Sequence, residues 1–279
     1  MINLGFVDPI IQSALEEDLG AGDLTTQAVV DPELHAEGRF YAKEDLVLAG
    51  WPVATRIFCR LSSQIDMEAQ CPEGCFVSKG TMFGVVRGTA ASLLAGERIA
   101  LNFLQRLSGI ATLTQRFVEH VTGTGVVILD TRKTTPGLRL LEKYAVRVGG
   151  GKNHRFGLYD GVLIKDNHIV AAGGIREAIL RARNRIDHLK KIEVEVKTFD
   201  ELEEALDAGA EMVLLDNMPV SQVQEAVRRN SGRALLEVSG GVNLGNVRDY
   251  ALTGVQFISV GALTHSARAV DINLELKLS

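Results

Sequence analysis

The chain has 279 residues, of which 46% are hydrophobic and 23% charged, and its formal net charge is −5 at neutral pH. This is the composition of an ordinary globular protein, which excludes a disordered, a collagen-like or a disulfide-framework chain. The mild acidity argues against a nucleic-acid binder. No apolar run reaches the roughly 20 residues that cross a bilayer, and the first residues lack the pattern of a signal peptide. We therefore expect a cytoplasmic protein with no membrane partner and one or two domains.

The three cysteines are few and unevenly spaced. Cys71 and Cys75 lie close together, but a single Cys-x-x-x-Cys without a second pair is a poor zinc signal. We expect reduced thiols, as is usual in the cytoplasm.

The first ninety residues or so predict a mixed α/β region. Residues 9–15 form a plausible first helix, with Asp8 as its cap and a proline at the first helical position. Residues 38–42 and 82–86 indicate short strands between glycines. Residues 91–107 have the apolar spacing of a long amphipathic helix.

From about residue 125, short β-branched runs alternate with amphipathic stretches, which is typical of βαβ units and a parallel sheet. The candidate strands are 126–130, 162–165, 192–196, 212–216, 235–239 and 257–260, and the candidate helices are 174–185, 200–208 and 220–229. A complete eight-fold barrel needs about 250 residues, and the alternation spans far fewer. The pattern therefore predicts an open α/β barrel of about six or seven parallel strands, beginning near Ser108-Gly109.

Polar residues follow the candidate strands, where barrel active sites lie. They are Asp130, Lys165, Glu195, Asp216, Ser239 with Gly240 and Gly241, and Gly261. A single acid at a strand end is often a helix cap or a surface residue. Because every candidate strand ends this way, the pattern favours a functional site.

The segment from 130 to 168 is basic, with eight Lys or Arg against four Asp or Glu, so the rest of the chain sums to −9. A basic patch in an acidic protein indicates binding of a polyanionic small molecule. A solvated helix face accounts for the cations at helical spacing, but not for those beside strands and glycine turns. The latter are Arg132, Lys133, Arg155 and Lys165.

Glycine-rich segments provide candidate anion sites. The loop 149–155 lets backbone amides and cations approach an anion closely. The segments 239–241 and 260–262 follow the last strands, where barrels commonly bind phosphate through backbone N–H groups.

Glu195 and Asp216 lie between these candidate phosphate sites. The two carboxylates would repel bound phosphates unless a divalent ion bridged them, and Mg²⁺ binds in this way. An internal ion pair with Lys165 is the alternative, and both arrangements can hold together.

These motifs resemble, in order and over nearly the whole chain, those of the quinolinate phosphoribosyltransferase family. The most specific are the DTRKTTPG block at 130–137 and the GGGxNHR block at 149–155. The other matching segments are 15–26, 97–102, 163–168, 193–196, 215–217, 239–240 and 259–263.

The resemblance implies an amino-terminal α/β sandwich over 1–108, joined by the returning segment 268–279, and an open barrel over 109–267. It implies a homodimer or a higher assembly of dimers, such as a hexamer. The implied reaction, a step of de novo NAD biosynthesis, joins quinolinate to phosphoribosyl diphosphate and gives nicotinate mononucleotide, diphosphate and CO2. Mg²⁺ would accompany the phosphoribosyl diphosphate, and no organic cofactor is implied.

The resemblance also implies roles for individual residues. Arg132, His154 and Arg155 would hold the two quinolinate carboxylates, and Arg98 would complete that pocket from the neighbouring subunit. The catalytic groups would be Lys133 and Lys165 beside the substrates, with Glu195 and Asp216 at the ribose or its metal ion. Ser239, Gly240, Gly241, Gly261 and Ala262 would hold the 5′-phosphate. We choose Glu195 over Glu193 because the later residue on a strand lies nearer the barrel mouth.

Three alternatives remain open. One is a relative of the same fold that uses nicotinate directly, which would need fewer cations at the ring pocket. Another is a non-catalytic or differently specific paralogue, such as those associated with molybdate transport. The third is a Schiff-base aldolase with Lys165 as nucleophile, which would need an apolar setting that the neighbouring acids oppose.

Overall fold

The computed structural model describes residues 2–278 and divides them into two compact units. The amino-terminal unit contains the chain up to Gln115, together with Thr134–Gly150 and the segment from Thr264 on. The barrel unit contains Arg116–Lys133 and Gly151–Leu263. Helix α4 (Ala90–His120) continues unbroken through the position near Ser108 where the domain boundary was predicted, and that boundary stays a prediction.

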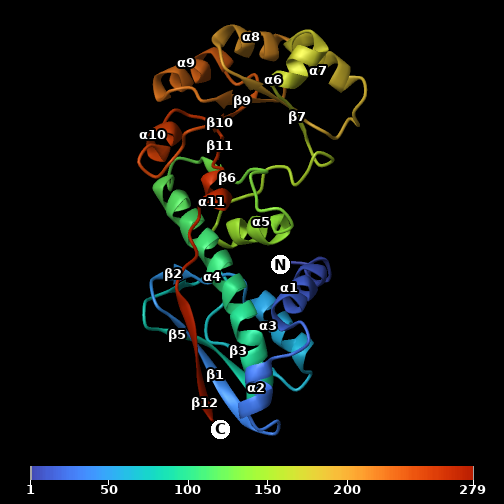
Figure 1. Cartoon of the computed structure of the whole chain (residues 1–279). Coiled ribbons are helices and arrows are strands. Elements are labelled where there is room, and N and C mark those ends of the chain that lie inside the picture. The colour runs from blue at the N-terminus through green and yellow to red at the C-terminus, as the bar shows by residue number, and fades with distance from the viewer. Residues whose placement is uncertain (1, 279) are drawn as a thin grey trace. The chain divides into compact units, whose positions relative to one another are not determined.

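A four-stranded antiparallel sheet forms the amino-terminal unit (Figure 1), in the order β12-β1-β5-β3. Its strands are β1 (His35–Ala42), β3 (Asp66–Ala69), β5 (Met82–Thr89) and β12 (Ile272–Leu278). The last strand pairs with β1 from Ala36 opposite Leu278 to Ala42 opposite Ile272. The expected return of the carboxyl-terminal segment to the first domain is therefore confirmed. The short strands β2 (Leu46–Val47) and β4 (Phe76–Val77) pair separately.

Aromatic side chains make the core of this unit. Phe40 of β1 meets Trp51 edge to face, with ring centroids 5.4 Å apart, and packs against Phe58 and Phe83. Trp51 and Phe58 belong to α3 (Trp51–Leu61), whose apolar face is buried on the sheet. Such edge-on aromatic packing adds to the free energy gained by burying the rings.

The chain begins with a 3₁₀ turn (Leu4–Phe6), α1 (Asp8–Leu19) and α2 (Leu24–Val29). The prediction that Asp8 caps the first helix is wrong, because Val7 occupies the cap and Asp8 is the first helical residue. Its carboxylate accepts bonds of 2.8 and 2.7 Å from the Arg56 guanidinium. Those bonds lower the pKa of Asp8 to about 2. Asp8 therefore joins α1 to α3 through an ion pair.

Cys71 and Cys75 lie side by side in the turn between β3 and β4, while Cys59 is a free thiol. A turn closed by the Cys75 N–H and the Pro72 carbonyl brings the two side chains together, and the expectation of reduced thiols stays a prediction. Glu73, between them, accepts a 2.7 Å bond from the Trp51 N–H and a bond from the Tyr144 hydroxyl.

Gly109 of α4 packs directly on the backbone that leads into β12. A methyl group added at Gly109 would lie 2.0 Å from the carbonyl oxygen of Arg268. We expect Gly109→Ala to destabilise the protein by about 1–3 kcal/mol through overpacking, measured by urea denaturation. Asn102→Ala, at an exposed position of the same helix, is the control. A Gly109→Ala protein as stable as this control would contradict the packing.

The barrel unit is built on a parallel sheet in the order β6-β11-β10-β9-β8-β7. The strands are β6 (Val127–Leu129), β7 (Val162–Ile164), β8 (Ile192–Val196), β9 (Met212–Asp216), β10 (Leu235–Ser239) and β11 (Phe257–Ser259). This six-stranded sheet confirms the predicted open barrel. The end strands β6 and β7 do not pair with each other within residues 2–278, so the barrel remains open.

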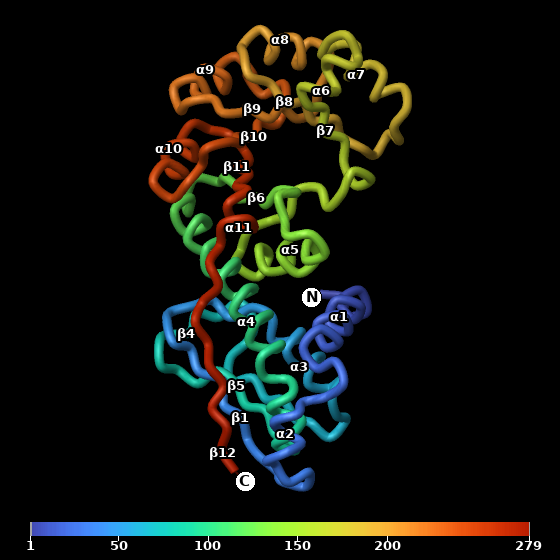
Figure 2. The backbone as a smooth tube through the Cα atoms, in the orientation of Figure 1, coloured from blue at the N-terminus to red at the C-terminus, as the bar shows by residue number. Residues whose placement is uncertain are grey.

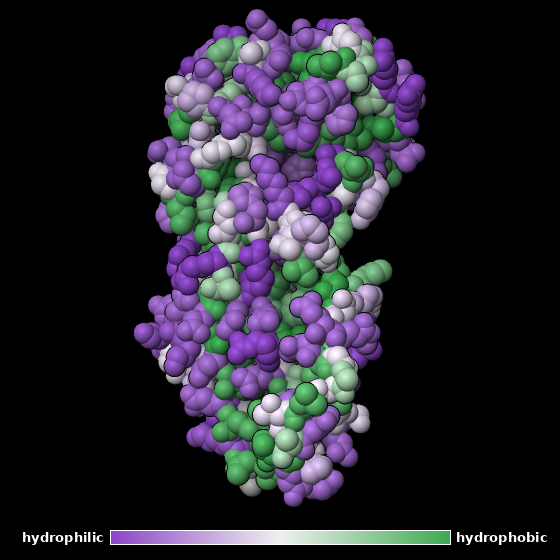
Figure 3. All heavy atoms as spheres, in the orientation of Figure 1, coloured by the Kyte–Doolittle hydropathy of each residue, from purple (hydrophilic) through white to green (hydrophobic). Residues whose placement is uncertain are grey.

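Helices α7 (Ile175–Arg183), α8 (Phe199–Asp207) and α9 (Val220–Asn230) cover the outer side of this sheet (Figures 1 and 2). All three were predicted to within two residues at each end. Hydrophilic side chains cover most of their outward surface on the face seen in Figure 3. Helices α5 (Arg139–Val148), α6 (Asp166–Ala172), α10 (Val247–Ala251) and α11 (Ala262–His265) complete the chain. Among residues 2–278, no helix is both long and apolar enough to cross a membrane.

Strand register decides which side chains face the barrel interior. On β8, Ile192, Val194 and Val196 are fully buried, and Glu193 and Glu195 lie on the opposite face because side chains alternate along a strand. Glu195 pairs with Leu214, and Leu214 pairs with Glu237 of β10. The inner face therefore carries several carboxylates among apolar residues.

Candidate functional site

Polar residues lie at the carboxyl ends of the barrel strands, as predicted. Asp216 of β9 pairs in register with Ser239 of β10, which pairs with Ser259 of β11. The Asn217 N–H also donates a 2.8 Å bond to the Ser239 carbonyl. Because all these strands are parallel, their ends meet at one edge of the sheet, where barrel active sites lie.

Lys165 and Glu195 form an ion pair at this edge, with 2.5 Å between Nζ and a carboxylate oxygen. The Glu195 side chain is 10% exposed and that of Lys165 45%. The ion pair that the sequence left open as an alternative is therefore present. One carboxylate oxygen of Glu195 contacts the lysine, which leaves the other oxygen for a further interaction.

Lys197 is a cation of this site that the sequence analysis missed. Its Nζ lies 3.3 Å from a carboxylate oxygen of Asp166. This contact raises the pKa of Lys197, and the nearby charges of Asp216 and Glu195 add to the effect. Lys197 directly follows β8, so the strand-end pattern that selected the other residues also pointed to it.

The candidate phosphate loop depends on glycine. Gly240 and Gly241, after β10, have φ values of 92° and 65°, a left-handed conformation that favours glycine. A methyl group at Gly240 would lie 2.2 Å from the side-chain oxygen of Asn217. The loop therefore has no side chains at these two positions beside Ser239. Gly261 and Ala262 follow β11, the neighbouring strand.

Asp130 organises the segment that carries His154 and Arg155. It follows β6, is fully buried, and accepts bonds of 2.5 Å from the Asn153 amide and 2.9 Å from the His154 N–H. This role was missed, since a strand-end acid by itself does not reveal its partner. Asp130 ties this segment to the end of β6.

Arg132 and Arg155 bring two guanidinium groups into one neighbourhood. Arg155 donates a 3.0 Å bond to the Gly161 carbonyl, and its pKa is lowered by burial and then by the charge of Arg132. Two neighbouring cations, one of them partly buried, favour an anionic ligand that neutralises both.

His154 also lies against two buried carboxylates on the inner face of the sheet. Its Nε2 is 3.0 Å from a Glu193 oxygen and 3.8 Å from a Glu237 oxygen. Burial, with the neighbouring charge of Glu193, raises the pKa of Glu237 to about 8. The donor atoms of these three residues lie within 4.8 Å of one another, the one such group of His, Cys, Asp or Glu among residues 2–278.

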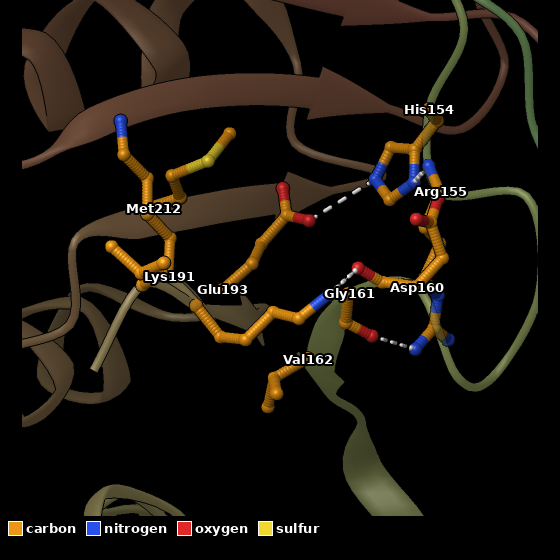
Figure 4. A pocket seen from close by; sticks show the side chains of 10 residues that line it. His154, Arg155, Asp160, Gly161, Val162, Lys191, Glu193 and Met212 are labelled. Atoms are coloured by element: carbon orange, nitrogen blue, oxygen red, sulfur yellow. Dashed lines mark hydrogen bonds and ion pairs between the residues drawn. The ribbon is translucent and has the colours of Figure 1, made fainter. Parts of the chain in front are cut away.

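A cavity of about 370 Å³ opens beside this cluster (Figure 4). It lies near the beginnings of β7, β8 and β9, and its lining includes His154, Arg155, Asp160, Lys190 and Glu193. In Figure 4 the His154 ring points toward the Glu193 carboxylate, and the Arg155 guanidinium toward the Gly161 carbonyl.

The predicted site residues fall mostly in one unit. Arg132, Lys133, His154, Arg155, Lys165, Glu195, Asp216, Ser239, Gly240, Gly241, Gly261 and Ala262 belong to the barrel unit. Arg98 lies at an exposed position of α4 in the amino-terminal unit. The roles of all these residues stay predictions.

Comparison with known proteins identifies relatives along the whole chain. Residues 23–108 match the family model "Quinolinate phosphoribosyl transferase, N-terminal domain", and residues 110–275 match the corresponding C-terminal domain. The chain is 44% identical over 263 residues to a probable nicotinate-nucleotide pyrophosphorylase [carboxylating] of Bacillus subtilis, covering 94% of this chain and 91% of the relative.

Two further matches extend this finding. The chain is 43% identical to quinolinate phosphoribosyltransferase [decarboxylating] 1b of Nicotiana tabacum, over 96% of this chain and 81% of the relative. The crystal structure of NadC from Streptococcus pyogenes superposes with a TM-score of 0.97 at 39% identity, over 100% of this chain and 99% of that one.

Proposed function

The chain belongs to the quinolinate phosphoribosyltransferase family, and on that premise we propose that it is an enzyme that transfers a phosphoribosyl group to quinolinate with loss of CO2. The products are nicotinate mononucleotide, diphosphate and CO2, in de novo NAD synthesis. The observation that supports the proposal for this chain is that Arg132 and Arg155 are neighbours. They lie in the same unit as the polar residues that follow the barrel strands.

Quinolinate has two adjacent carboxylates on a pyridine ring. Their negative charges match the positive charges in and near residues 153–155. A guanidinium binds a carboxylate through two parallel hydrogen bonds, so two arginines match a diacid. A nicotinate-specific enzyme has one carboxylate fewer to neutralise. We assign the diacid to Arg132, His154 and Arg155, with Arg98 reaching it from a neighbouring subunit of a homodimer.

The other substrate is phosphoribosyl diphosphate. Its 5′-phosphate would lie against the glycine-containing backbone that follows β10 and β11. Its ligands would be Ser239, Gly240, Gly241, Gly261 and Ala262. Glu195 and Asp216 would face the ribose, where positive charge develops as the bond from the anomeric carbon to diphosphate breaks. Lys133 and Lys165 would stabilise the negative charge of the leaving group.

Carboxylate oxygens are the donors that Mg²⁺ prefers, and it binds through one or two of them together with substrate phosphates. Glu195 and Asp216 fit this requirement, because Lys165 contacts one Glu195 oxygen and the other is left for a metal. A bound Mg²⁺ would supply charge neutralisation at the diphosphate. We propose these two carboxylates as its ligands, and we propose no organic cofactor.

The decarboxylation follows from the first bond made. When the pyridine nitrogen attacks the anomeric carbon, the ring nitrogen becomes cationic. Its positive charge then stabilises the electron pair that stays on C2 when the bond from C2 to its carboxylate breaks, so CO2 leaves and that pair on C2 takes a proton. The chain's contribution is to align the two substrates and stabilise charge.

A product assay tests the proposed function. Purified protein is mixed with phosphoribosyl diphosphate, Mg²⁺ and either quinolinate or nicotinate, and the products are identified by mass spectrometry. We expect nicotinate mononucleotide from quinolinate alone, and less than about 1% of that rate from nicotinate, because one ion-paired carboxylate is worth about 3 kcal/mol. Equal rates would support direct use of nicotinate.

No product from a folded protein would support the non-catalytic paralogue instead. Inactivation by borohydride in the presence of a carbonyl substrate would support the aldolase, with Lys165 as the trapped residue. Sedimentation of the same preparation tests the proposed homodimer, and fractionation of the source cells tests the proposed cytoplasmic location.

A further inference from the structure

Besides Glu195, the inner face of the barrel sheet carries two further glutamates, Glu193 and Glu237, where barrels usually carry branched apolar residues. Glu193 lies in the same row as Leu163 and Met212, and Glu237 in the same row as Leu214 and Phe257. Glu193 is 5% exposed and Glu237 is fully buried. Buried carboxylates destabilise a fold unless they are paired, so their presence here requires a reason.

Both carboxyl groups lie beside one side chain, the imidazole of His154. Glu193 approaches its Nε2 at 3.0 Å, and Glu237 approaches the same nitrogen at 3.8 Å. The other ring nitrogen, Nδ1, accepts a 2.7 Å bond from the Arg155 N–H. Since Nδ1 accepts, the ring proton is on Nε2 and is donated to Glu193. These contacts select one tautomer and one orientation of the ring.

The backbone around His154 is held as firmly as its ring. Buried Asp130 accepts from the Asn153 side chain and from the His154 N–H. The Arg155 guanidinium bonds the Gly161 carbonyl. The segment from Asn153 to Arg155 is therefore anchored from β6, from β8 and from the turn before β7.

We propose that Glu193 is a positioning residue that holds the His154 imidazole in this tautomer and thereby sets the position of Arg155 in the diacid pocket. This inference rests on the proposed function for its kinetic consequence only. Glu193 acts through His154, while the binding contacts to quinolinate come from Arg132 and Arg155.

Glu193 variants test the role of the closer carboxylate. In Glu193→Gln the amide oxygen still accepts from Nε2–H, whereas Glu193→Met removes that acceptor. A hydrogen bond of this kind is worth about 1.5–3 kcal/mol, so we expect Glu193→Met to raise the KM for quinolinate about tenfold to hundredfold. The KM for phosphoribosyl diphosphate and kcat should stay within about threefold, and Glu193→Gln should restore most of the loss.

Nitrogen-15 NMR of the histidine rings gives a readout that does not depend on activity. His154 is one of six histidines, and its signals are identified by their absence in His154→Gln. We expect the Nε2–H tautomer in the wild type and in Glu193→Gln, and a mixture of tautomers in Glu193→Met. Glu237→Met should show a smaller change, because Glu237 lies farther from Nε2.

Glu211→Gln is the matched control. Glu211 lies just before β9, pairs with Arg183 and accepts from the Ile192 N–H, and it belongs neither to the proposed site nor to the His154 cluster. We expect wild-type KM values and an unchanged His154 spectrum. If Glu193→Met and Glu211→Gln behave alike in both readouts, the positioning role is wrong. If the wild type makes no product while the tautomer still depends on Glu193, the proposed function fails and the positioning of His154 stands.

Discussion

Arg155→Met should raise the KM for quinolinate by about a thousandfold, while the KM for phosphoribosyl diphosphate changes by less than about twofold. Arg155 is partly buried beside Arg132, and both features lower the pKa of its guanidinium. A guanidinium in this setting gains most when a carboxylate neutralises it, so its loss removes a strong paired contact worth about 4 kcal/mol. Steady-state kinetics with each substrate varied in turn provide the measurement.

Arg155→Lys separates charge from geometry in the same experiment. Lysine keeps the positive charge but lacks the planar fork that bonds both oxygens of a carboxylate, so we expect an intermediate KM. Arg181→Met, at an exposed position in the last turn of α7, controls for the removal of an arginine as such. An equal rise in both KM values would show that Arg155 supports the fold and does not select the diacid.

Lys165→Met should lower kcat by about a hundredfold to a thousandfold. Lys165 pairs with Glu195 at 2.5 Å and remains 45% exposed at the edge where the barrel strands end. In the proposed role, its loss removes a positive charge that stabilises the departing diphosphate, and it also takes from the nearly buried Glu195 carboxylate its ion-pair partner. Single-turnover rates of diphosphate release measure the chemical step directly.

Lys165→Arg keeps the charge and the ion pair, so it should recover part of kcat. Lys79→Met, in an exposed turn of the amino-terminal unit, controls for the loss of a lysine elsewhere. Unchanged single-turnover rates in Lys165→Met would remove Lys165 from the chemical step and leave it the structural role of neutralising Glu195.

The barrel was predictable because its signal is local. Each strand is a short apolar run, and each following helix has apolar residues at helical spacing, so strands such as Met212–Asp216 and helices such as Val220–Asn230 are readable from neighbouring residues alone. The same local signal identified Lys165, Glu195 and Asp216, which lie at the ends of candidate strands. Because parallel strands all run in one direction, the residues at their carboxyl ends lie at the same end of the barrel.

Other features depended on partners far away in the chain. Asp8 was predicted to cap α1, but Arg56, 48 residues later, holds its carboxylate instead. Helix α4 was predicted to end at 107, yet it continues to His120 through Gly109, which packs on the backbone at Arg268.

By itself, therefore, the sequence determined the open parallel barrel, the return of the last strand through its family resemblance, and the set of charged residues at the strand ends. Only the tertiary structure decided how these groups pair: Lys165 with Glu195 across two strands, and His154 with Glu193, 39 residues later. The physical reason is that periodicity records which face a residue takes, whereas a hydrogen bond between buried groups depends on the register of strands and on segments that pack across the sheet.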